Sequence, residues 1–463
     1  MTIRRLVLAL DDRLGVAPIL RKALRKAFPD NWSFMFGEIA LYCFLALLAT
    51  GIYLGFFFDA STAPATYRGS DIALRGAPMS AAFASVVRLS LDTRAGLLLR
   101  QIHHWAALVF LAAIALHMCR IFFTGAFRRP RELNWVIGMT LLVLAMAAGF
   151  TGYSLPDDLL SGTGLRIAYS VLLSVPVVGG YLAFLFFGGA FPTTEAISRL
   201  LFTHVVILPA LIAGAIGVHL AIIWRQKHTQ FRGPGRTEGN VIGSPLWPNY
   251  AIKSIGLGLA TAAILAGLGG FFQINPIWLY GPYHPWDVSA PAQPDWYIGW
   301  LEGALRLGPR WTIDLLHHTI PSPFFPGVVL PCVFFALLYL WPFLERWVTH
   351  DGEAHQLLDH PSDAPVRTAI GGAVLTFAIV LTLAGSDDVQ ANIFSIPVQG
   401  MVAAYRWLLV ILPIAVGLLS YQFAREIRAR RNQLPAPAPR VAISRTESGG
   451  FKDEPESLPS NRR

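Results

Sequence analysis

Eight apolar stretches, each close to the length of a membrane-crossing helix, dominate the sequence. About twenty apolar residues in a helix cross the hydrocarbon core of a bilayer. Only 14% of the 463 residues are charged and 54% are hydrophobic, which is too little charge for the surface of a soluble protein of this size. The sequence therefore predicts an all-α, polytopic membrane protein with eight transmembrane helices. The stretches run at about 35–58, 97–123, 135–153, 200–224, 252–272, 324–343, 369–385 and 402–421.

A ninth apolar stretch, at about 168–191, is predicted to form helices that lie at the outer surface. Pro176, Gly179 and Gly180 interrupt it. Counting it as a span would put the basic loop at about 225–236 outside, whereas Lys and Arg collect on the cytoplasmic side. With eight spans, the basic residues among the first 26, at 128–131 and at 425–431 all lie inside. We expect a plasma-membrane protein with both termini cytoplasmic, whose net charge of +9 follows from this topology and does not indicate nucleic acid.

Two of the apolar stretches each carry a pair of histidines. His103 and His117 are fourteen residues apart, and His204 and His219 are fifteen apart. At about 100° and 1.5 Å per residue, these steps return to within about 40° and 60° of the starting face after roughly 21 and 22 Å. His104 competes with His103, but its step of thirteen to His117 points it about 140° away. Two such helices would present facing imidazoles at two depths, as two six-coordinate haem irons require.

Arginines accompany the histidines. Arg100, Arg120 and Arg199 each lie within five residues of a candidate ligand. An arginine at membrane depth needs an anion, and haem propionates would supply one. The alternative is that these residues mark helix ends, where a long side chain reaches the interface. Because the sequence has no Cys-x-x-Cys-His motif, haem here would be held by ligation alone.

Glycines repeat the histidine interval in the first and third spans. Gly37 and Gly51 are fourteen residues apart, as are Gly138 and Gly152. Each helix could thus present patches without side chains at two depths, against which a flat macrocycle would fit. Membrane helices also use glycine for close packing, so the signal depends on its agreement with the histidines.

The outer loop between the fifth and sixth spans holds a carboxylate among aromatic residues. The four residues are Pro294, Asp295, Trp296 and Tyr297. A carboxylate in a partly buried site can take a proton from a hydroxylated ring whose electrons are leaving. By itself the motif equally fits an interfacial aromatic belt in which Asp295 is a helix N-cap.

Together, the ligand spacing, glycine spacing, arginine positions and this tetrapeptide resemble cytochrome b of the quinol–cytochrome c reductase (cytochrome bc) complexes, over about residues 30–345. The resemblance implies an N-terminal four-helix bundle that holds two b haems. It also implies that the tetrapeptide forms the quinol-oxidation motif, with Asp295 as proton acceptor where many members have Glu, and with Tyr297 shaping the site. The implied ligands are His103 and His204 for the outer, lower-potential haem and His117 and His219 for the inner, higher-potential haem.

The implied activity is oxidation of quinol at the outer site. One electron would pass to a Rieske iron–sulphur protein and the other through the two haems to an inner quinone site, which contributes to a proton gradient. The partners expected from the resemblance are the Rieske protein, a cytochrome c subunit and, as a further candidate, a terminal oxidase, in a dimeric complex surrounded by membrane lipid.

Departures from the family pattern narrow the branch. The fifteen-residue step with Pro209 looks like the chloroplast and Gram-positive branch, yet the halves that are separate in the chloroplast complex are fused here. Met35 stands where the chloroplast-type chain has the cysteine for an extra haem, so we expect no third haem. Ser254 and Trp224 replace mitochondrial-type residues, which leaves the inner quinone site unassigned. The stretches 149–158 and 226–231 look actinobacterial, and such organisms mainly use menaquinone, so menaquinol is the expected substrate.

We expect four parts in the chain: a basic cytoplasmic segment (1–34), the dihaem four-helix bundle (35–235), a C-terminal quinol-site domain with four helices (236–428) and a disordered cytoplasmic tail (429–463). Two other functions fit some of the same residues. One is a b-type haem membrane anchor of a dehydrogenase, and the other is a membrane transporter whose histidines are proton relays or core residues.

Overall fold

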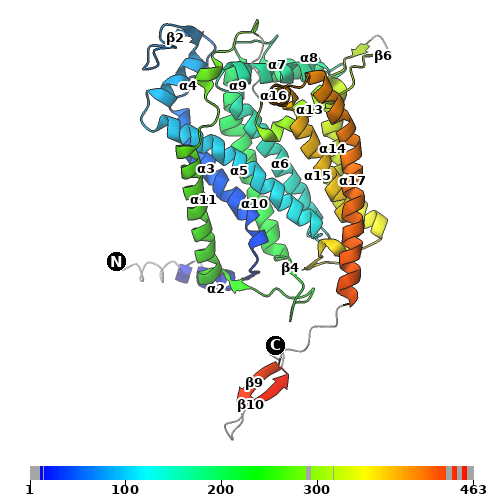
Figure 1. The fold of residues 1–463 in the computed structure, drawn as a ribbon. Coiled ribbons are helices and arrows are strands. Elements are labelled where there is room, and N and C mark those ends of the chain that lie inside the picture. The colour runs from blue at the N-terminus through cyan, green and yellow to red at the C-terminus, as the bar shows by residue number, and fades with distance from the viewer. Residues whose placement is uncertain are drawn as a thin grey trace.

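The computed structural model describes residues 11–13, 15–287, 293–315 and 318–433, and the strands at 441–445 and 451–455. Within these residues, eight helical segments are long and apolar enough to cross a membrane, which confirms the predicted number. Helices are expected here because each backbone polar group in lipid needs a partner within its own segment. The spans run alongside one another (Figure 1). Their bounds are Trp32–Gly55, Gly96–Phe123, Glu132–Tyr153, Ala196–Gln226, Leu246–Phe271, Phe325–Thr349, Pro365–Ala384 and Val398–Gln433.

Four of these spans form the N-terminal bundle. Its helices are α3 (Phe36–Gly55), α5 (Gly96–Phe123), α6 (Glu132–Tyr153) and α10 (Leu208–Gln226), the last continuing from α9 (Ala196–Phe202). Helix α3 packs along α5, and α6 packs along α10. Apolar side chains from all four helices, including Phe44, Phe110, Ala145 and Ile212, meet in one buried core.

The span that carries His204 contains a widened turn. Residues Thr203–Ile207 form a π-helical turn between α9 and α10. Such a turn holds one residue more than an α-helical turn, and Pro209 just after it lacks the N–H that a regular helix would use. The extra residue is absorbed here. The fifteen-residue step from His204 to His219 therefore covers the same number of turns as the fourteen-residue step in α5.

The second half of the chain packs against this bundle. Helix α11 (Ala251–Phe271), with the short η3 (Leu246–Tyr250) before it, contacts α3 and α5. Helix α14 (Leu330–Thr349), which follows the π-helical η4 (Phe325–Val329), contacts α6. A second core joins α13 (Trp296–Leu307), α15 (Pro365–Ala384) and α17 (Val398–Gln433). Helix α17 continues twelve residues beyond the predicted end of its span at 421.

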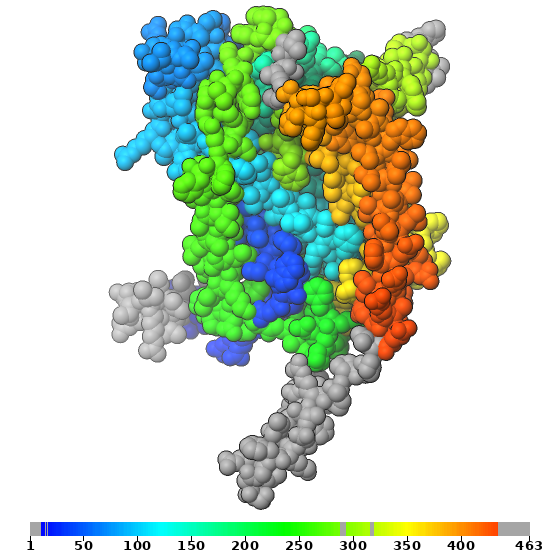
Figure 2. Space-filling view, viewed as in Figure 1, coloured from blue at the N-terminus to red at the C-terminus, as the bar shows by residue number. Residues whose placement is uncertain are grey.

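Side chains on two of these helices form an apolar outer surface. Figure 2 shows α11 and α17 at the two edges of one face, with parts of the N-terminal bundle visible between them. Ile255 and Leu259 of α11 are 57% and 69% exposed, and Trp407 of α17 is 71% exposed. An apolar surface of this extent is what membrane-spanning helices present.

The ninth apolar stretch does not form a span. It is divided between α7 (Leu159–Leu173) and α8 (Gly179–Phe187), which are separated at Pro176 and lie across one end of the spans (Figure 1). Asp158 begins α7 with a capping box in which its side chain accepts from the backbone N–H of Ser161. Elements at this end of the molecule include α4 (Ala81–Leu91), β2 (Pro64–Thr66) paired with β3 (Pro78–Ser80), α16 (Asp387–Phe394), and β6 (Ile313–Leu315) paired with β7 (His318–Ile320). The remaining short helix of this region is α12 (Ile277–Tyr280).

Short basic and polar elements lie at the opposite end. Helix α2 (Val16–Leu24) runs across the ends of the spans and carries Arg21 and Lys22 in its last turn (Figure 1). Two strand pairs tie distant segments together at this end: β1 (Ala27–Phe28) with β5 (Ser244–Pro245), antiparallel, and β4 (Gln230–Phe231) with β8 (Leu357–Leu358), parallel. The short helical turns η1 (Trp32–Phe34) and η5 (Pro361–Asp363) precede α3 and α15.

The predicted domain boundaries remain predictions at both termini. The first ten residues, and most of the tail beyond Gln433, lie outside the described residues. In the tail, β9 (Val441–Arg445) and β10 (Phe451–Pro455) pair antiparallel. Helix α17 runs across the predicted boundary at 428–429.

Candidate haem and quinol sites

The structure brings the four histidines together as two facing pairs. The ring centroids of His103 and His204 are 6.2 Å apart, and those of His117 and His219 are 6.5 Å apart. A metal held by two imidazole nitrogens, with bonds of about 2.0 Å on each side, would place the two ring centroids about 6 Å apart. Each pair is therefore spaced for one metal ion with a histidine on either side.

Hydrogen bonds fix the ring orientation of the pair that lies nearer α7 and α8, the outer pair. Nδ1 of His103 lies 2.9 Å from Oγ1 of Thr50, whose own hydroxyl donates to a backbone carbonyl one turn earlier. Nδ1 of His204 lies 3.0 Å from the carbonyl of Ala148 and 3.2 Å from Oγ1 of Thr151. In both rings Nδ1 is thus the donor, which leaves the lone pair on Nε2 for a metal.

All four predicted glycines lie against the histidines. Helices α5 and α10, with the π turn before α10, supply the imidazoles, while α3 and α6 supply the glycines. A side chain at any of these positions would point at a ring. The nearest ring atom to a Cβ added at each position would be Cε1, at 2.5 Å for Gly152 and His204, 3.1 Å for Gly51 and His103, 3.3 Å for Gly37 and His117, and 3.9 Å for Gly138 and His219.

Two of the three predicted arginines have guanidinium nitrogens without partners among the described residues. Arg100 is only 8% exposed, and although its Nη1 donates to the carbonyl of Asn275 at 3.1 Å, its Nε and Nη2 are unpaired. Nε and Nη2 of Arg120 are unpaired as well, and its guanidinium lies 4.0 Å over the ring of Phe34. Burying such donors unpaired is costly. Anionic haem propionates would satisfy them, so the residues present fit this cofactor.

Arg199 is arranged differently. Its Nη1 donates to the carbonyls of Phe184 at 3.1 Å and Leu185 at 2.8 Å, near the end of α8. The guanidinium is therefore used in holding a surface helix in place. This arrangement favours the alternative interpretation of Arg199, as a residue that marks a helix end.

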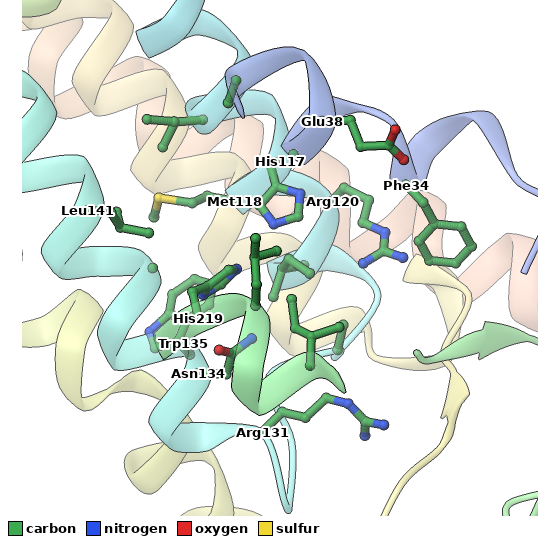
Figure 3. A pocket seen from close by; sticks show the side chains of 18 of the residues that line it. Phe34, Glu38, His117, Met118, Arg120, Arg131, Asn134, Trp135, Leu141 and His219 are labelled. Carbon is green, nitrogen blue, oxygen red and sulfur yellow. The ribbon is translucent and has the colours of Figure 1, made fainter. Parts of the chain in front are cut away.

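A cavity of about 240 Å³ surrounds the inner pair. Figure 3 shows His117 and His219 projecting toward it from two different helices, with Arg120 beside Phe34 at one side. The whole inner set predicted from the sequence lines this one cavity: His117, His219, Gly37, Gly138 and Arg120.

The same cavity is lined by a carboxylate that the sequence analysis missed. Glu38 accepts hydrogen bonds from the hydroxyls of Tyr250 and Ser254, and Glu38 and Tyr250 line the cavity. Tyr42 in turn donates to the carbonyl of Ser254 at 2.8 Å. The available signal was a single acidic residue, directly after Gly37, in an otherwise apolar span.

His228 also lines this cavity, and it lies beyond the end of the fourth span. Its ring packs against Phe28 with centroids 4.6 Å apart. Burial, and then the charges of Lys26, Arg120 and Arg131, lower the pKa of His228 to about 4. The imidazole is therefore neutral at pH 7 and one ring nitrogen can accept a hydrogen bond. The sequence of the stretch 226–231 did not predict a role for His228.

The outer carboxylate is held by side chains and not by a helix cap. Asp295 precedes α13, but its side chain makes no capping hydrogen bond. Its Oδ1 lies 2.8 Å from Nε2 of His104, and its Oδ2 accepts from the hydroxyl of Tyr297 at 3.0 Å. Tyr297 is 4% exposed and Trp296 is 43% exposed, so Tyr297 turns inward and Trp296 outward, after a half-buried Pro294. Asp295 therefore occupies the N-cap position of α13 without capping the helix through its side chain.

One turn of α6 lies against both the outer histidine pair and the Asp295 loop. A Cβ at Gly149 would be 2.4 Å from the hydroxyl of Tyr297, while one at Gly152 would meet His204. The Asp295 site and the outer histidine pair therefore both contact this turn of α6. Neither contact could be predicted from the sequence, in which Gly149 belongs to the stretch 149–158 and His104 lies thirteen residues before His117.

Comparison with known proteins agrees with this arrangement. The family model described as "Cytochrome b(N-terminal)/b6/petB" matches residues 108–282. Three similar proteins are each named "Cytochrome bc1 complex cytochrome b subunit". The one from Mycobacterium leprae is 51% identical over 89% of this chain and 75% of its own length. Those from Mycobacterium tuberculosis and Streptomyces coelicolor are 49% and 45% identical, over 96% and 91% of this chain and 81% and 77% of their own lengths.

A solved structure shares the fold. A chain of "Hyperthermophilic respiratory Complex III" superposes with a TM-score of 0.66 at 21% identity, covering 90% of this chain and 99% of that one. The identities to the mycobacterial and streptomycete proteins extend along most of both sequences and settle the relationship. The chain belongs to the family of cytochrome b subunits of the cytochrome bc1 complex.

Proposed function

We propose that this cytochrome b holds two haems and oxidises menaquinol at a site built around Asp295. As a member of its family, the chain is the core membrane subunit of a quinol–cytochrome c oxidoreductase and an integral protein of the bacterial plasma membrane. The dehydrogenase anchor and the transporter are thereby set aside. One observation supports the proposed site above all: the Asp295 loop and the outer histidine pair lie against the same turn of α6.

The haem sites follow from the two facing pairs. His103 and His204 would hold the outer haem and His117 and His219 the inner one, with Arg100 and Arg120 paired to propionates. Bound there, the haems would supply a one-electron path between the two sides of the membrane. The protein's own contribution is to fix the imidazole tautomers through Thr50 and Thr151, and to leave flat spaces at the glycines.

Asp295 is the proposed proton acceptor for quinol. Quinol loses two protons and two electrons on oxidation, and a carboxylate within hydrogen-bonding reach of the ring hydroxyl can take one of the protons. The buried Tyr297 hydroxyl donates to the same carboxylate and shapes the site. The two electrons part here: one leaves toward a Rieske iron–sulphur protein, and the other toward the outer histidine pair.

The Glu38 cluster is the candidate inner quinone site. Quinone reduction consumes protons, and Glu38, Tyr250 and Ser254 form a hydrogen-bonded group beside the inner pair. His228 adds a neutral imidazole to the same cavity. Arg21 and Lys22 of α2 lie at this end of the molecule, which supports a cytoplasmic orientation for it and for both termini.

The partners inferred for the chain are a Rieske iron–sulphur protein and a cytochrome c subunit, in a dimeric complex within membrane lipid and in association with a terminal oxidase. Co-purification followed by mass spectrometry tests this assembly. Recovery of the chain without any iron–sulphur protein would contradict the division of electrons at the outer site.

Three measurements on the purified complex test the site itself. A pyridine haemochrome assay should give two haem b groups per chain. Asp295→Ala should slow quinol oxidation about a hundredfold or more, to a rate that is still measurable, while both haems stay bound. Asp287→Ala, at an exposed carboxylate of the same loop, should behave as wild type. Turnover at the wild-type rate in Asp295→Ala would refute the role of Asp295, and one haem per chain would refute the dihaem assignment. Menaquinol oxidised no faster than ubiquinol would refute the quinone assignment.

A further inference from the structure

His104 contacts the outer carboxylate from the helix that carries two of the candidate ligands. It follows His103 directly on α5, and its Nε2 lies 2.8 Å from Oδ1 of Asp295. The two side chains are only 13% and 14% exposed, so they are largely shielded from solvent. The helical step that turns His104 away from the histidine pair points it toward the loop before α13.

We propose that His104 is a positioning residue that holds the Asp295 carboxylate in place for quinol. The inference rests on the proposed role of Asp295 as proton acceptor. Each carboxylate oxygen receives one hydrogen bond, Oδ1 from His104 on α5 and Oδ2 from Tyr297 on α13. Two donors on two different helices fix both the position and the plane of a short side chain.

The competing position for this carboxylate is the N-terminus of its own helix. An aspartate just before a helix ordinarily accepts from the backbone N–H groups of the first turn. Asp295 occupies that sequence position, yet its side chain makes no such bond. The contact with His104 draws Oδ1 toward α5. Without it, the carboxylate would be free to turn back and cap α13, away from the quinol.

The contact between His104 and Asp295 also links the proposed proton acceptor to the helix that carries the outer histidine pair's His103. His103 and His104 are neighbours on one rigid helix, one facing the outer pair and the other facing Asp295. Helix α5 therefore fixes the position of the Asp295 carboxylate and also that of a candidate haem ligand. Residues on rigid elements hold catalytic geometry more closely than residues on loops do.

The test compares two substitutions of His104 in the purified complex. His104→Ala removes the donor, whereas His104→Gln keeps an N–H donor of similar reach. We expect His104→Ala to lower kcat for quinol oxidation about tenfold or more with little change in KM, and His104→Gln to restore most of it. Both haem bands should stay unchanged in the reduced-minus-oxidised spectrum. The matched control is His350→Ala, at an exposed histidine directly after the last residue of α14.

A double-mutant cycle with Asp295→Ala separates the possible outcomes. If His104 acts through Asp295, the double variant should be no slower than Asp295→Ala alone. Additive losses would overturn the proposal, as would normal turnover in His104→Ala when Asp295→Ala is slowed. Loss of a haem band in His104→Ala without rescue by Gln would overturn it too, because the role would then be support of the haem. Turnover at the wild-type rate in Asp295→Ala would instead refute the proposed function.

Discussion

Replacing Gly152 by alanine should remove the outer haem, while the same change at Gly138 should leave the inner haem in place. A methyl group at position 152 would lie 2.5 Å from Cε1 and 3.0 Å from Nε2 of His204. A methyl group at position 138 would lie 3.9 Å from Cε1 of His219, an ordinary van der Waals contact. Either α6 or the His204 ring has to move in the first case, and neither has to move in the second.

The structure also sets the size of the effect. Inserting a methyl group into a packed site costs about 1–3 kcal/mol. At about 1.4 kcal/mol per factor of ten, haem affinity at the outer site should fall by about 5-fold to 150-fold. The added contact would be 3.1 Å at Gly51 and 3.3 Å at Gly37. The four positions should therefore rank in sensitivity as 152, 51, 37 and 138.

The assay is the haem content of each purified variant, from a pyridine haemochrome assay together with the resolved α-bands of the reduced protein. Gly180→Ala is the matched control, because an added Cβ at that glycine meets nothing within 4 Å. We expect about one haem per chain in Gly152→Ala and two in Gly138→Ala. Equal losses in these two variants, or full haem content in Gly152→Ala, would show that the glycines do not make room for the cofactor.

Three further changes test other parts of the sites. Thr50→Val removes the acceptor for Nδ1 of His103. The lost hydrogen bond, worth about 0.5–1.5 kcal/mol, should raise the midpoint potential of the outer haem by about 20–60 mV in a redox titration, and the potential of the inner haem is the internal control. Arg120→Leu should lower the content of the inner haem, because a buried partner for a propionate is lost, whereas Arg199→Leu should keep both haems; the reverse pattern would contradict the assignment. The folded-state pKa of His228 is about 4, so between about pH 4 and 6.5 the unfolded chain binds more protons than the folded chain. Acidification through that window should therefore lower the free energy of unfolding by up to about 3 kcal/mol, which is measured as a fall in the melting temperature. His228→Gln should flatten this pH dependence.

Much of the fold and of the histidine geometry could be predicted because the signals are local. Span length follows from apolar runs, and the facing of His103 and His117 follows from helical period alone. The helical period alone could not show that His204 and His219, which are fifteen residues apart, lie on the same face of their span. A regular helix would place His204 and His219 about 60° apart, and only the π turn at Thr203–Ile207 brings the second pair into register.

The environment of Asp295 could not be predicted from its neighbours in the sequence. Local preference favours a cap for an aspartate before a helix, and that preference is overridden here by a histidine 191 positions earlier. Spacing also could not tell Arg100 from Arg199. Both lie close to a ligand in sequence, but the carbonyls of α8 take up the guanidinium of Arg199, whereas most of that of Arg100 is buried without a partner among the described residues.

The two histidine pairs differ in a way that bears on the direction of electron flow. Both outer imidazoles donate from Nδ1, to Thr50 and to the Ala148 carbonyl, whereas Nδ1 of His117 in the inner pair finds no hydrogen-bond partner among the described residues. A hydrogen bond donated from the far ring nitrogen makes an imidazole a more basic ligand and favours the oxidised metal. With haems bound at both pairs, this difference would give the outer haem the lower potential, and an electron released beside Asp295 would move downhill toward the inner pair. The protein's own hydrogen bonds would thus supply part of the driving force across the membrane.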